Sequence, residues 1–252
     1  MPHYLTFALV APLAAFGAIA VGERRSGWDR PARSAVLGLV AACLGLERED
    51  DAAQAALAED YGLALLCHSP GRLLADYHTA QVPPAQRGRR FATRAEELAA
   101  PGLNTILSRR DYRSGAWHLG ALWPRREAAR WPLEALAEAM ERPGFVPYLG
   151  RKSCPLGLPL APRILEAADA PAALLARHAE GPEARLEHPQ GRSLRAALAD
   201  TPGEMVIVLD ASDVSPDDAR LRRIERRRDQ PRSRRRWQFN LREEAVLGAG
   251  AA

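Results

Sequence analysis

The residues best suited to chemistry lie in a loop near the middle of the chain, FVPYLGRKSCPLGLPL, residues 145–160. Its three prolines and two glycines favour a loop held in one shape over a helix or a central strand. Arg151, the chain's only lysine Lys152, and Ser153 stand together there with free backbone amides. Such a loop could hold an anion, for example a phosphodiester. On composition alone, a structural turn with two solvated cations is the alternative.

A second candidate is an arginine cluster near the C-terminus. Ten of the seventeen residues from Arg220 to Arg236 are arginine, so this stretch carries about +8 while the whole chain carries +4. A local cluster on a mildly acidic body indicates a polyanion bound at one place, because the planar guanidinium matches phosphate. The alternative is a disordered basic tail. We expect Pro231 to break the segment, while Trp237 and Phe239 alternate as on a strand and favour a folded end. We expect this cluster to meet the loop of residues 145–160, so that the two form one cradle for a nucleotide chain.

A third candidate is the start of the first predicted helix, Ala32–Leu46, which Pro31 opens as its first residue. Arg33 and Ser34 lie in its first turn, where unpaired amides could assist them in holding a phosphate. The preceding glycine-rich segment, residues 11–30, interleaves arginines with Trp28 and resembles a nucleic-acid contact. A surface loop with one half-buried tryptophan explains that segment equally well.

The elements that position these residues follow from periodicity and breakers. A buried strand is predicted at Tyr4–Val10, further strands at Leu63–His68, Leu73–Thr79 and Met205–Asp210, and two more within Thr105–Trp123, joined at 113–115. Helices are predicted at Ala32–Leu46, Asp50–Asp60, Leu133–Glu141 and Ala167–Ala179. The order strand, helix, strand, strand, helix predicts an α+β fold with a ferredoxin-like half, whose open sheet face can take RNA.

One segment, residues 81–104, breaks the pattern. It holds a Pro-Pro pair and four arginines with little periodicity, so we predict a projecting insertion. These arginines are Arg87, Arg89, Arg90 and Arg94. In the strand that follows, Arg109, Arg110 and Arg113 could face RNA, but Asp111 among them makes a solvated strand face equally plausible.

Other features limit the chemistry and the compartment. Three widely spaced cysteines and six scattered histidines form no disulfide framework and no metal-ligand pattern, so we expect no metal, no cofactor and a reducing cytoplasm. No Lys or Arg precedes the apolar N-terminal region and Pro12 interrupts it, which argues against a signal peptide. The apolar run 35–46 is too short to span a bilayer, and no membrane association is expected.

Four blocks of the sequence resemble a known family. They are residues 30–50 (RPARSAVLGLVAACLGLERED), 76–79 (DYHT), 147–160 (PYLGRKSCPLGLPL) and 227–239 (RRDQPRSRRRWQF). Together they resemble the Cas-five family of the RAMP superfamily, as found in the type I-E CRISPR Cascade complex. One departure is the loop after the first strand, where the family's usual Gln is missing and its Trp is Phe16.

The resemblance implies an RRM-related, RAMP-type ferredoxin-like domain at 1–145, with a projecting thumb at about 81–104. It further implies a smaller β-rich part at 146–242, and we expect a frayed tail at 243–252. The implied role is non-catalytic: to grip the 5′ handle of the CRISPR guide RNA and cap the CasC backbone beside the large subunit CasA. Target DNA near the protospacer-adjacent motif is a further candidate partner, and guide maturation falls to another subunit, CasE.

The candidate RNA contacts combine cations for phosphates with planes for splayed bases. They are Arg30, Arg33, Ser34, Arg109, Tyr148, Arg151, Lys152, Ser153, Arg234, Arg235, Arg236 and Trp237, with the four thumb arginines in addition. For each aromatic residue a place in the core is at least as plausible. An alternative function is a metal-independent endoribonuclease, as in type I-C systems, with Tyr112, His118 and Lys152 as its candidate residues. A third is a free-standing basic module that binds RNA or DNA.

Overall fold

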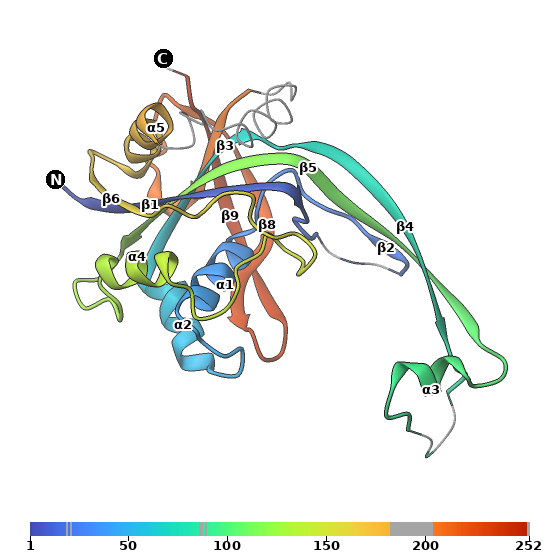
Figure 1. Ribbon diagram of the computed structural model, residues 1–252. Helices are drawn as coiled ribbons and strands as arrows, with labels where there is room; N and C mark the ends of the chain where they lie inside the picture. Colours follow the sequence, from blue (N-terminus) through green and yellow to red (C-terminus); the bar gives the residue numbers. More distant parts are fainter. Residues whose placement is uncertain (19, 21, 86–87, 89, 182–203, 251–252) are drawn as a thin grey trace.

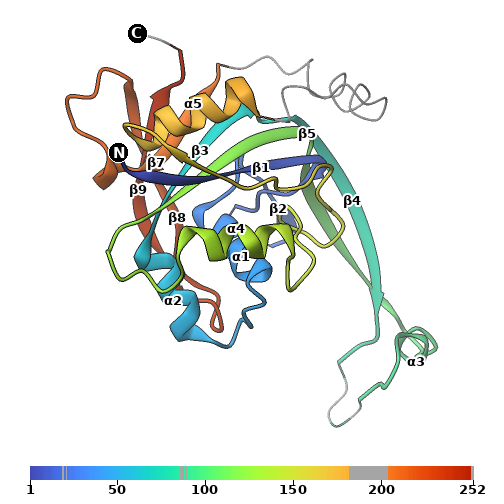
Figure 2. The same ribbon diagram turned by 60° about the vertical axis from the view of Figure 1, so that its left-hand side comes forward.

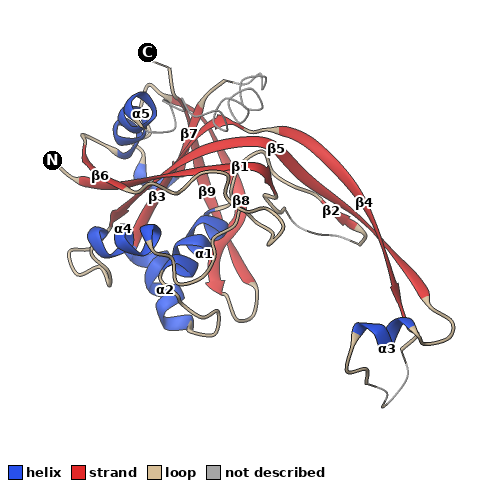
Figure 3. Cartoon of the chain, viewed as in Figure 1, coloured by secondary structure: helices blue, strands red, loops and turns tan. Residues whose placement is uncertain are grey.

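A computed structural model describes residues 1–18, 20, 22–85, 88, 90–181 and 204–250. These residues form one sheet in which the path β6-β1-β5-β3-β7-β9-β8 carries β2 and β4 on β5, with helices on both faces (Figures 1 and 3). The strands are β1 (His3–Ala14), β2 (Arg24–Arg25), β3 (Tyr61–Ser69), β4 (Arg72–Val82), β5 (Asn104–Pro124), β6 (Arg163–Glu166), β7 (Val206–Asp210), β8 (Leu221–Ser233) and β9 (Gln238–Gly248). The helices are α1 (Arg33–Cys43), α2 (Asp51–Asp60), α3 (Arg94–Leu98), α4 (Leu133–Glu141) and α5 (Ala170–Glu180), with a short 3₁₀ helix at Ala211–Asp213.

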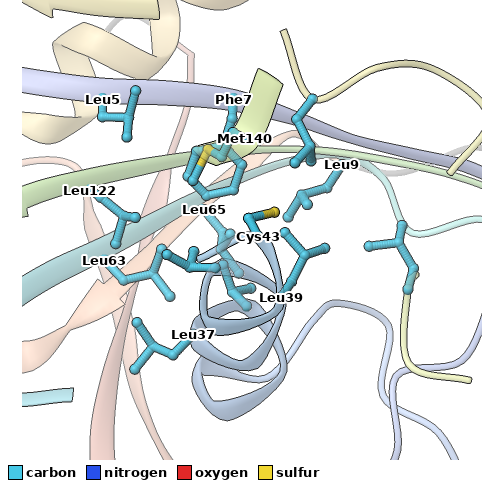
Figure 4. Packing of buried hydrophobic residues seen from close by; sticks show 14 of the residues in the cluster. Leu5, Phe7, Leu9, Leu37, Leu39, Cys43, Leu63, Leu65, Leu122 and Met140 are labelled. Atoms are coloured by element: carbon cyan, nitrogen blue, oxygen red, sulfur yellow. The ribbon is translucent and has the colours of Figure 1, made fainter. Parts of the chain in front are cut away.

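The sheet is covered on both faces, which explains why its central strands are apolar at nearly every position. On one face, Phe7 and Leu9 of β1 pack with Leu37 of α1 and Met140 of α4 (Figure 4). On the other, alternate residues of the same strands pack with Leu174 of α5. The turned view shows α5 and α1 on opposite sides of the sheet (Figure 2). The predicted helices are confirmed, although α1 begins two residues after Pro31, with Ala32 as its N-cap.

Strand β5 is 21 residues long, and the prediction of two strands joined at 113–115 was wrong. Gly115 adopts φ +72°, yet β5 stays paired with β1 on both sides of it, at Ser114 and Ala116. The glycine therefore lets one strand bend instead of reversing it. Both β3 and β4 pair with this strand, β3 with its second half and β4 with its first.

The first half of β5 and the whole of β4 leave the body as a two-stranded ribbon, here called the ribbon (residues 72–82 and 104–114) (Figures 1 and 2). The segment between its strands, with α3, lies at the tip, where no residue of α3 is buried. The described residues of the segment 81–104 therefore project from the body, as the sequence indicates. Arg87 and Arg89 lie outside the described residues.

The C-terminal strands differ from the prediction in three ways. Residues 243–248, expected to fray, belong to β9, where Val246 and Leu247 are buried between β7 and β8. The apolar run there fills a central strand position, so the expectation of a frayed tail was wrong for these residues. Pro231 does not break β8, which pairs Pro231 with Phe239, and Trp237 lies in the turn before β9 at φ +53°. The proposed boundary at residue 145 stays a prediction, and strands from both sides of it share the sheet.

Two further features concern the cysteines and the lengths of the helices. Cys43, Cys67 and Cys154 are buried free thiols. Across the described ranges, no helix combines the length and apolar composition that crossing a membrane requires.

Candidate nucleic-acid interface

The loop of residues 148–155, here called the central loop, is held rigidly against the end of β1. Gly150 adopts φ +93°, and a Cβ atom there would lie 1.7 Å from the carbonyl oxygen of Ala15. The amide of Ala15 donates to the carbonyl of Leu149 at 3.0 Å, and the amide of Leu149 donates to the carbonyl of Cys154 at 2.9 Å. Only glycine fits at position 150, which explains part of the unusual composition of this loop.

The rim of the central loop offers several groups to an anion. Within the described residues, the backbone amides of residues 151–153 donate to no backbone carbonyl. The Arg151 guanidinium lies 4.5 Å from the centre of the Tyr112 ring, and its Nη1 is buried without a hydrogen-bond partner. Lys152 and Ser153 are exposed beside it. Consecutive free amides next to guanidinium and ammonium groups can bind a phosphate.

The turn between β8 and β9 brings a second set of cations to the same place. Arg234 Nη1 donates to the carbonyl of Ser34 in α1 at 3.2 Å. Burial lowers the pKa of Arg234, and repulsion from Arg48 lowers it further. Arg48 and Arg234 flank the Trp237 ring, with guanidinium carbons 4.5 and 5.7 Å from its centre. Trp237 itself is 58% exposed and is therefore accessible for stacking.

These two segments meet at one cavity of about 600 Å³. Its walls come from the end of α1 and the chain after it, from the central loop with the residues just before it, and from the β8–β9 turn. The lining residues are Gly38, Ala41, Ala42, Leu46, Glu47, Arg48, Gln54, Phe145, Val146, Pro147, Tyr148, Lys152, Pro155 and Arg234. The expected meeting of the central loop with the arginine-rich end is confirmed.

Two candidate RNA contacts, Arg30 and Arg33, were wrong, because both side chains are buried. The Arg30 guanidinium donates to Glu244 at 2.6 and 3.0 Å and to Glu225 at 2.6 Å. Arg33 donates to the carbonyls of Ala58 and Tyr61, and its own amide donates to Asp229 at 2.9 Å. Protein carboxylates and carbonyls therefore occupy the helix start that the sequence assigned to phosphate.

The other candidates are distributed as follows. Ser34 is half-buried beside the cavity, while Arg235 and Arg236 are exposed in the β8–β9 turn. At the tip of the ribbon, Arg94 forms an ion pair with Glu97 at 2.6 Å and Arg90 is exposed.

A separate cluster lies midway along the ribbon. Arg109 pairs with Tyr77 of β4 on one side and with Arg24 of β2 on the other. Residues paired in this way project from the same face of a sheet. Tyr77 is 63% exposed and the Arg109 side chain 55%, with Asp111 4.0 Å away. An aromatic and two guanidinium groups thus form one row across β4, β5 and β2.

Sequence reasoning missed two residues that shape the cavity. Gly38 lies within the apolar first helix, and its lack of a side chain makes room for the Arg234 guanidinium. Arg48 follows the same helix and stacks on Trp237. A glycine inside a helix is a usable signal for close approach, whereas nothing around Arg48 distinguishes it from a solvated surface arginine.

The residues considered for RNA cleavage do not form an accessible catalytic set. His118 is fully buried, and desolvation, with smaller contributions from nearby cations, lowers its pKa to about 3. Tyr112 is 7% exposed beneath Arg151. A general base must reach the 2′-hydroxyl of its substrate, which a buried His118 does not do.

Fold and site together define a sheet-dominated α/β protein with a projecting ribbon and a cation-rimmed cavity. The family model described as CRISPR-associated protein (Cas_Cas5) matches residues 4–243. The chain belongs to this family. It is 33% identical over 183 residues to the CRISPR system Cascade subunit CasD of Escherichia coli (strain K12), covering 69% of this chain and 77% of that protein.

Solved structures show the same fold. A chain of a CRISPR RNA-guided surveillance complex aligns with a TM-score of 0.59 at 20% identity, covering 97% of this chain and 89% of that one. A second structure, described as a Cas protein, aligns with a TM-score of 0.55 at 24% identity, covering 98% and 95% of the two chains.

Proposed function

We propose that this protein is a non-catalytic, cytoplasmic RNA-binding subunit of a type I-E Cascade complex and holds the 5′ handle of the CRISPR guide RNA. The observation that carries the proposal is the meeting of the central loop and Arg234 at one cavity. The names of the relatives, a Cascade subunit and an RNA-guided surveillance complex, support the same role.

Each part of this interface has a task in the proposal. The free amides of residues 151–153, with Arg151 and Lys152, take phosphate oxygens. Trp237 and Tyr148, 58% and 36% exposed, offer ring faces to splayed bases. Arg235 and Arg236 extend the positive surface along the turn.

We also propose that the body is a ferredoxin-like domain of the RAMP type. The strands β6, β1, β5 and β3 lie in this order, and each adjacent pair is antiparallel. Helices α1 and α2 connect β1 to β3, and α4 lies between β5 and β6. With β2 and β4 left aside, this order supports the proposal, because the ferredoxin-like motif runs strand-helix-strand-strand-helix-strand.

The ribbon serves in the proposal as the thumb that docks on the CasC backbone and caps it, with the large subunit CasA nearby. Its exposed apolar side chains, Leu73, Leu74 and Ile106, are 49–55% accessible. Exposed apolar residues spread along a projection favour a protein interface. Target DNA near the protospacer-adjacent motif is a further partner for the exposed row of Arg24, Arg109 and Tyr77.

The test is charge reversal in the assembled complex. The double variant Arg151→Glu, Lys152→Glu places negative charge where phosphate should lie, so guide occupancy should fall. The matched control is Arg142→Glu, on a side chain that is 82% exposed at the end of α4. Normal guide occupancy in the double variant would contradict the proposal.

The non-catalytic part has its own test. The protein is incubated with repeat RNA in EDTA, and products ending in a 2′,3′-cyclic phosphate are sought. Such a product, lost on Lys152→Ala, would establish a metal-independent nuclease instead.

A further inference from the structure

We propose that the cavity between α1, the central loop and the β8–β9 turn receives one unstacked base of the bound RNA, whose adjoining phosphate lies on the central loop. This inference rests on the proposed function and adds the chemistry of one subsite to it.

One part of the cavity wall is apolar. We call this apolar lining the floor: Ala41, Ala42 and Leu46 from α1 and the chain after it, and the more exposed Phe145 and Val146 before the central loop. Phe145 and Val146 are 44% and 80% exposed. An aromatic base buries apolar ring faces against such a floor, and about 600 Å³ is ample room for it.

The rim of the cavity is cationic. Arg48, Lys152 and Arg234 line it against one carboxylate, Glu47. Two of these cations, Arg48 and Arg234, lie over the same ring, Trp237, and repel each other. Like charges held together in this way are stabilised when an anion joins them. A phosphate at the rim would supply that anion.

The apolar floor and the cationic rim together match the two chemical parts of a nucleotide, its base and its phosphate. The apolar floor would accept an aliphatic side chain of a protein partner, but such a ligand leaves the three cations unpaired. A nucleotide supplies an apolar ring and an anion, joined through one sugar. Lys152 belongs both to the cavity wall and to the loop whose amides are free, so base and phosphate sites are contiguous.

Two polar side chains that line the cavity, Gln54 and Glu47, can bind the hydrogen-bonding edge of a base. Gln54 Nε2 donates to the carbonyl of Glu47 at 3.2 Å, which leaves the Gln54 amide oxygen and the Glu47 carboxylate as acceptors. Both acceptors can take hydrogen bonds from N–H donors of a base. The Watson–Crick edge of an extruded base provides such donors.

The first experiment uses the intact complex without any protein variant. Guide RNAs carry 2-aminopurine at one position of the 5′ handle at a time, and quenching of its fluorescence by acrylamide is measured. We expect one position to be strongly protected from the quencher while its fluorescence remains that of an unstacked base. Uniform quenching along the handle would overturn the inference.

The second experiment fills the cavity. Ala42→Phe occupies the floor, and Ala42→Leu is a smaller filler should the first variant fold poorly. The control is Ala179→Phe, the same change at an exposed position of α5 on the opposite face of the sheet. We expect the filled variants to lose the protected position and about tenfold in RNA affinity, while the control keeps both.

The outcomes separate the two proposals. If Ala42→Phe binds RNA normally and the Arg151, Lys152 double reversal does not, the subsite is wrong and the RNA-binding role stands. If neither changes binding, the RNA-binding role fails as well. If filling the cavity spares RNA but blocks assembly, a protein side chain occupies the cavity, which overturns the inference.

Discussion

The Arg234 guanidinium lies directly over the Cα atom of Gly38, so closely that a Cβ there would come within 2.4 Å of Nη2. Because the obstructing atom ends a flexible side chain, Gly38→Ala should displace Arg234 and leave the helix intact. The helix itself gains up to about 1 kcal/mol from the replacement. We expect an unchanged or higher melting temperature together with an RNA affinity about tenfold lower, through loss of one charged contact. Affinity equal to wild type would show that the position of Arg234 does not matter to RNA.

Gly150→Ala should damage the central loop itself. Its new Cβ would meet a backbone carbonyl oxygen at 1.7 Å, at a φ that side chains rarely adopt. We expect a loss of more than about 2 kcal/mol in the free energy of unfolding, measured by urea denaturation. Gly17→Ala is the matched control, since nothing lies within 4 Å of a Cβ there. A small effect at position 150 would mean that the loop tolerates rearrangement.

Arg30 and Lys152 should separate stability from binding. Arg30→Ala removes charged hydrogen bonds to Glu244, which is 1% exposed and keeps Arg227 and Arg242 as partners, and should cost about 1.5–3 kcal/mol of stability. Lys152→Ala removes an exposed cation and should change stability by less than about 0.5 kcal/mol while weakening RNA binding. Urea denaturation and an RNA titration on both variants check this. The opposite pattern would assign the RNA contact to Arg30.

Acid should destabilise the protein through His118. Burial, aided by Arg30, lowers the pKa of His118 to about 3, whereas the unfolded chain has an ordinary pKa near about 6.5. Between these values the unfolded state binds the extra proton, so stability falls as pH falls from about 6.5 towards about 3. The whole window is worth about 5 kcal/mol. His118→Leu should flatten this part of the curve, and the difference between wild-type and variant unfolding free energies against pH isolates the effect. Parallel curves would indicate that His118 is protonated in the fold.

The ribbon tip should be dispensable for folding and required for assembly. Val82 and Asn104 are directly paired, so replacing residues 83–103 by Asn-Gly gives a two-residue hairpin between them. No residue of α3 is buried, and the melting temperature should stay within a few degrees of wild type. We expect the shortened protein to fail to join the CasC filament in a reconstitution assay. Normal assembly would show that the thumb lies elsewhere.

Helices were predictable because local signals define them. Pro132 precedes the periodic apolar pattern of α4, and Asp50 caps α2 by accepting from the amide of Ala53. Strand β5 was not, since Arg113-Ser114-Gly115 has the composition of a turn, and pairing with β1 on both sides of Gly115 keeps the strand extended there. The pairing partner lies about a hundred residues away and leaves no local trace.

The candidate site was predicted in outline and corrected in detail. Lys152 and Arg234 lie at one cavity because proline and glycine shape the loop and a hairpin carries the arginine. Arg30 and Arg33 resembled phosphate ligands only because their true partners, Glu244 and Asp229, lie about two hundred residues further along the chain. A motif shows which groups are present but not which carboxylates the fold will bring to them.

Because β5 runs unbroken from the sheet centre to the ribbon tip, its length sets how far the tip lies from the body. Side chains alternate along a strand, so one inserted residue would transfer every later side chain to the opposite surface. Two residues added to each strand preserve the alternation and lengthen the ribbon by about 7 Å. Paired insertions of this size would therefore lengthen the ribbon without changing which of its side chains face each surface.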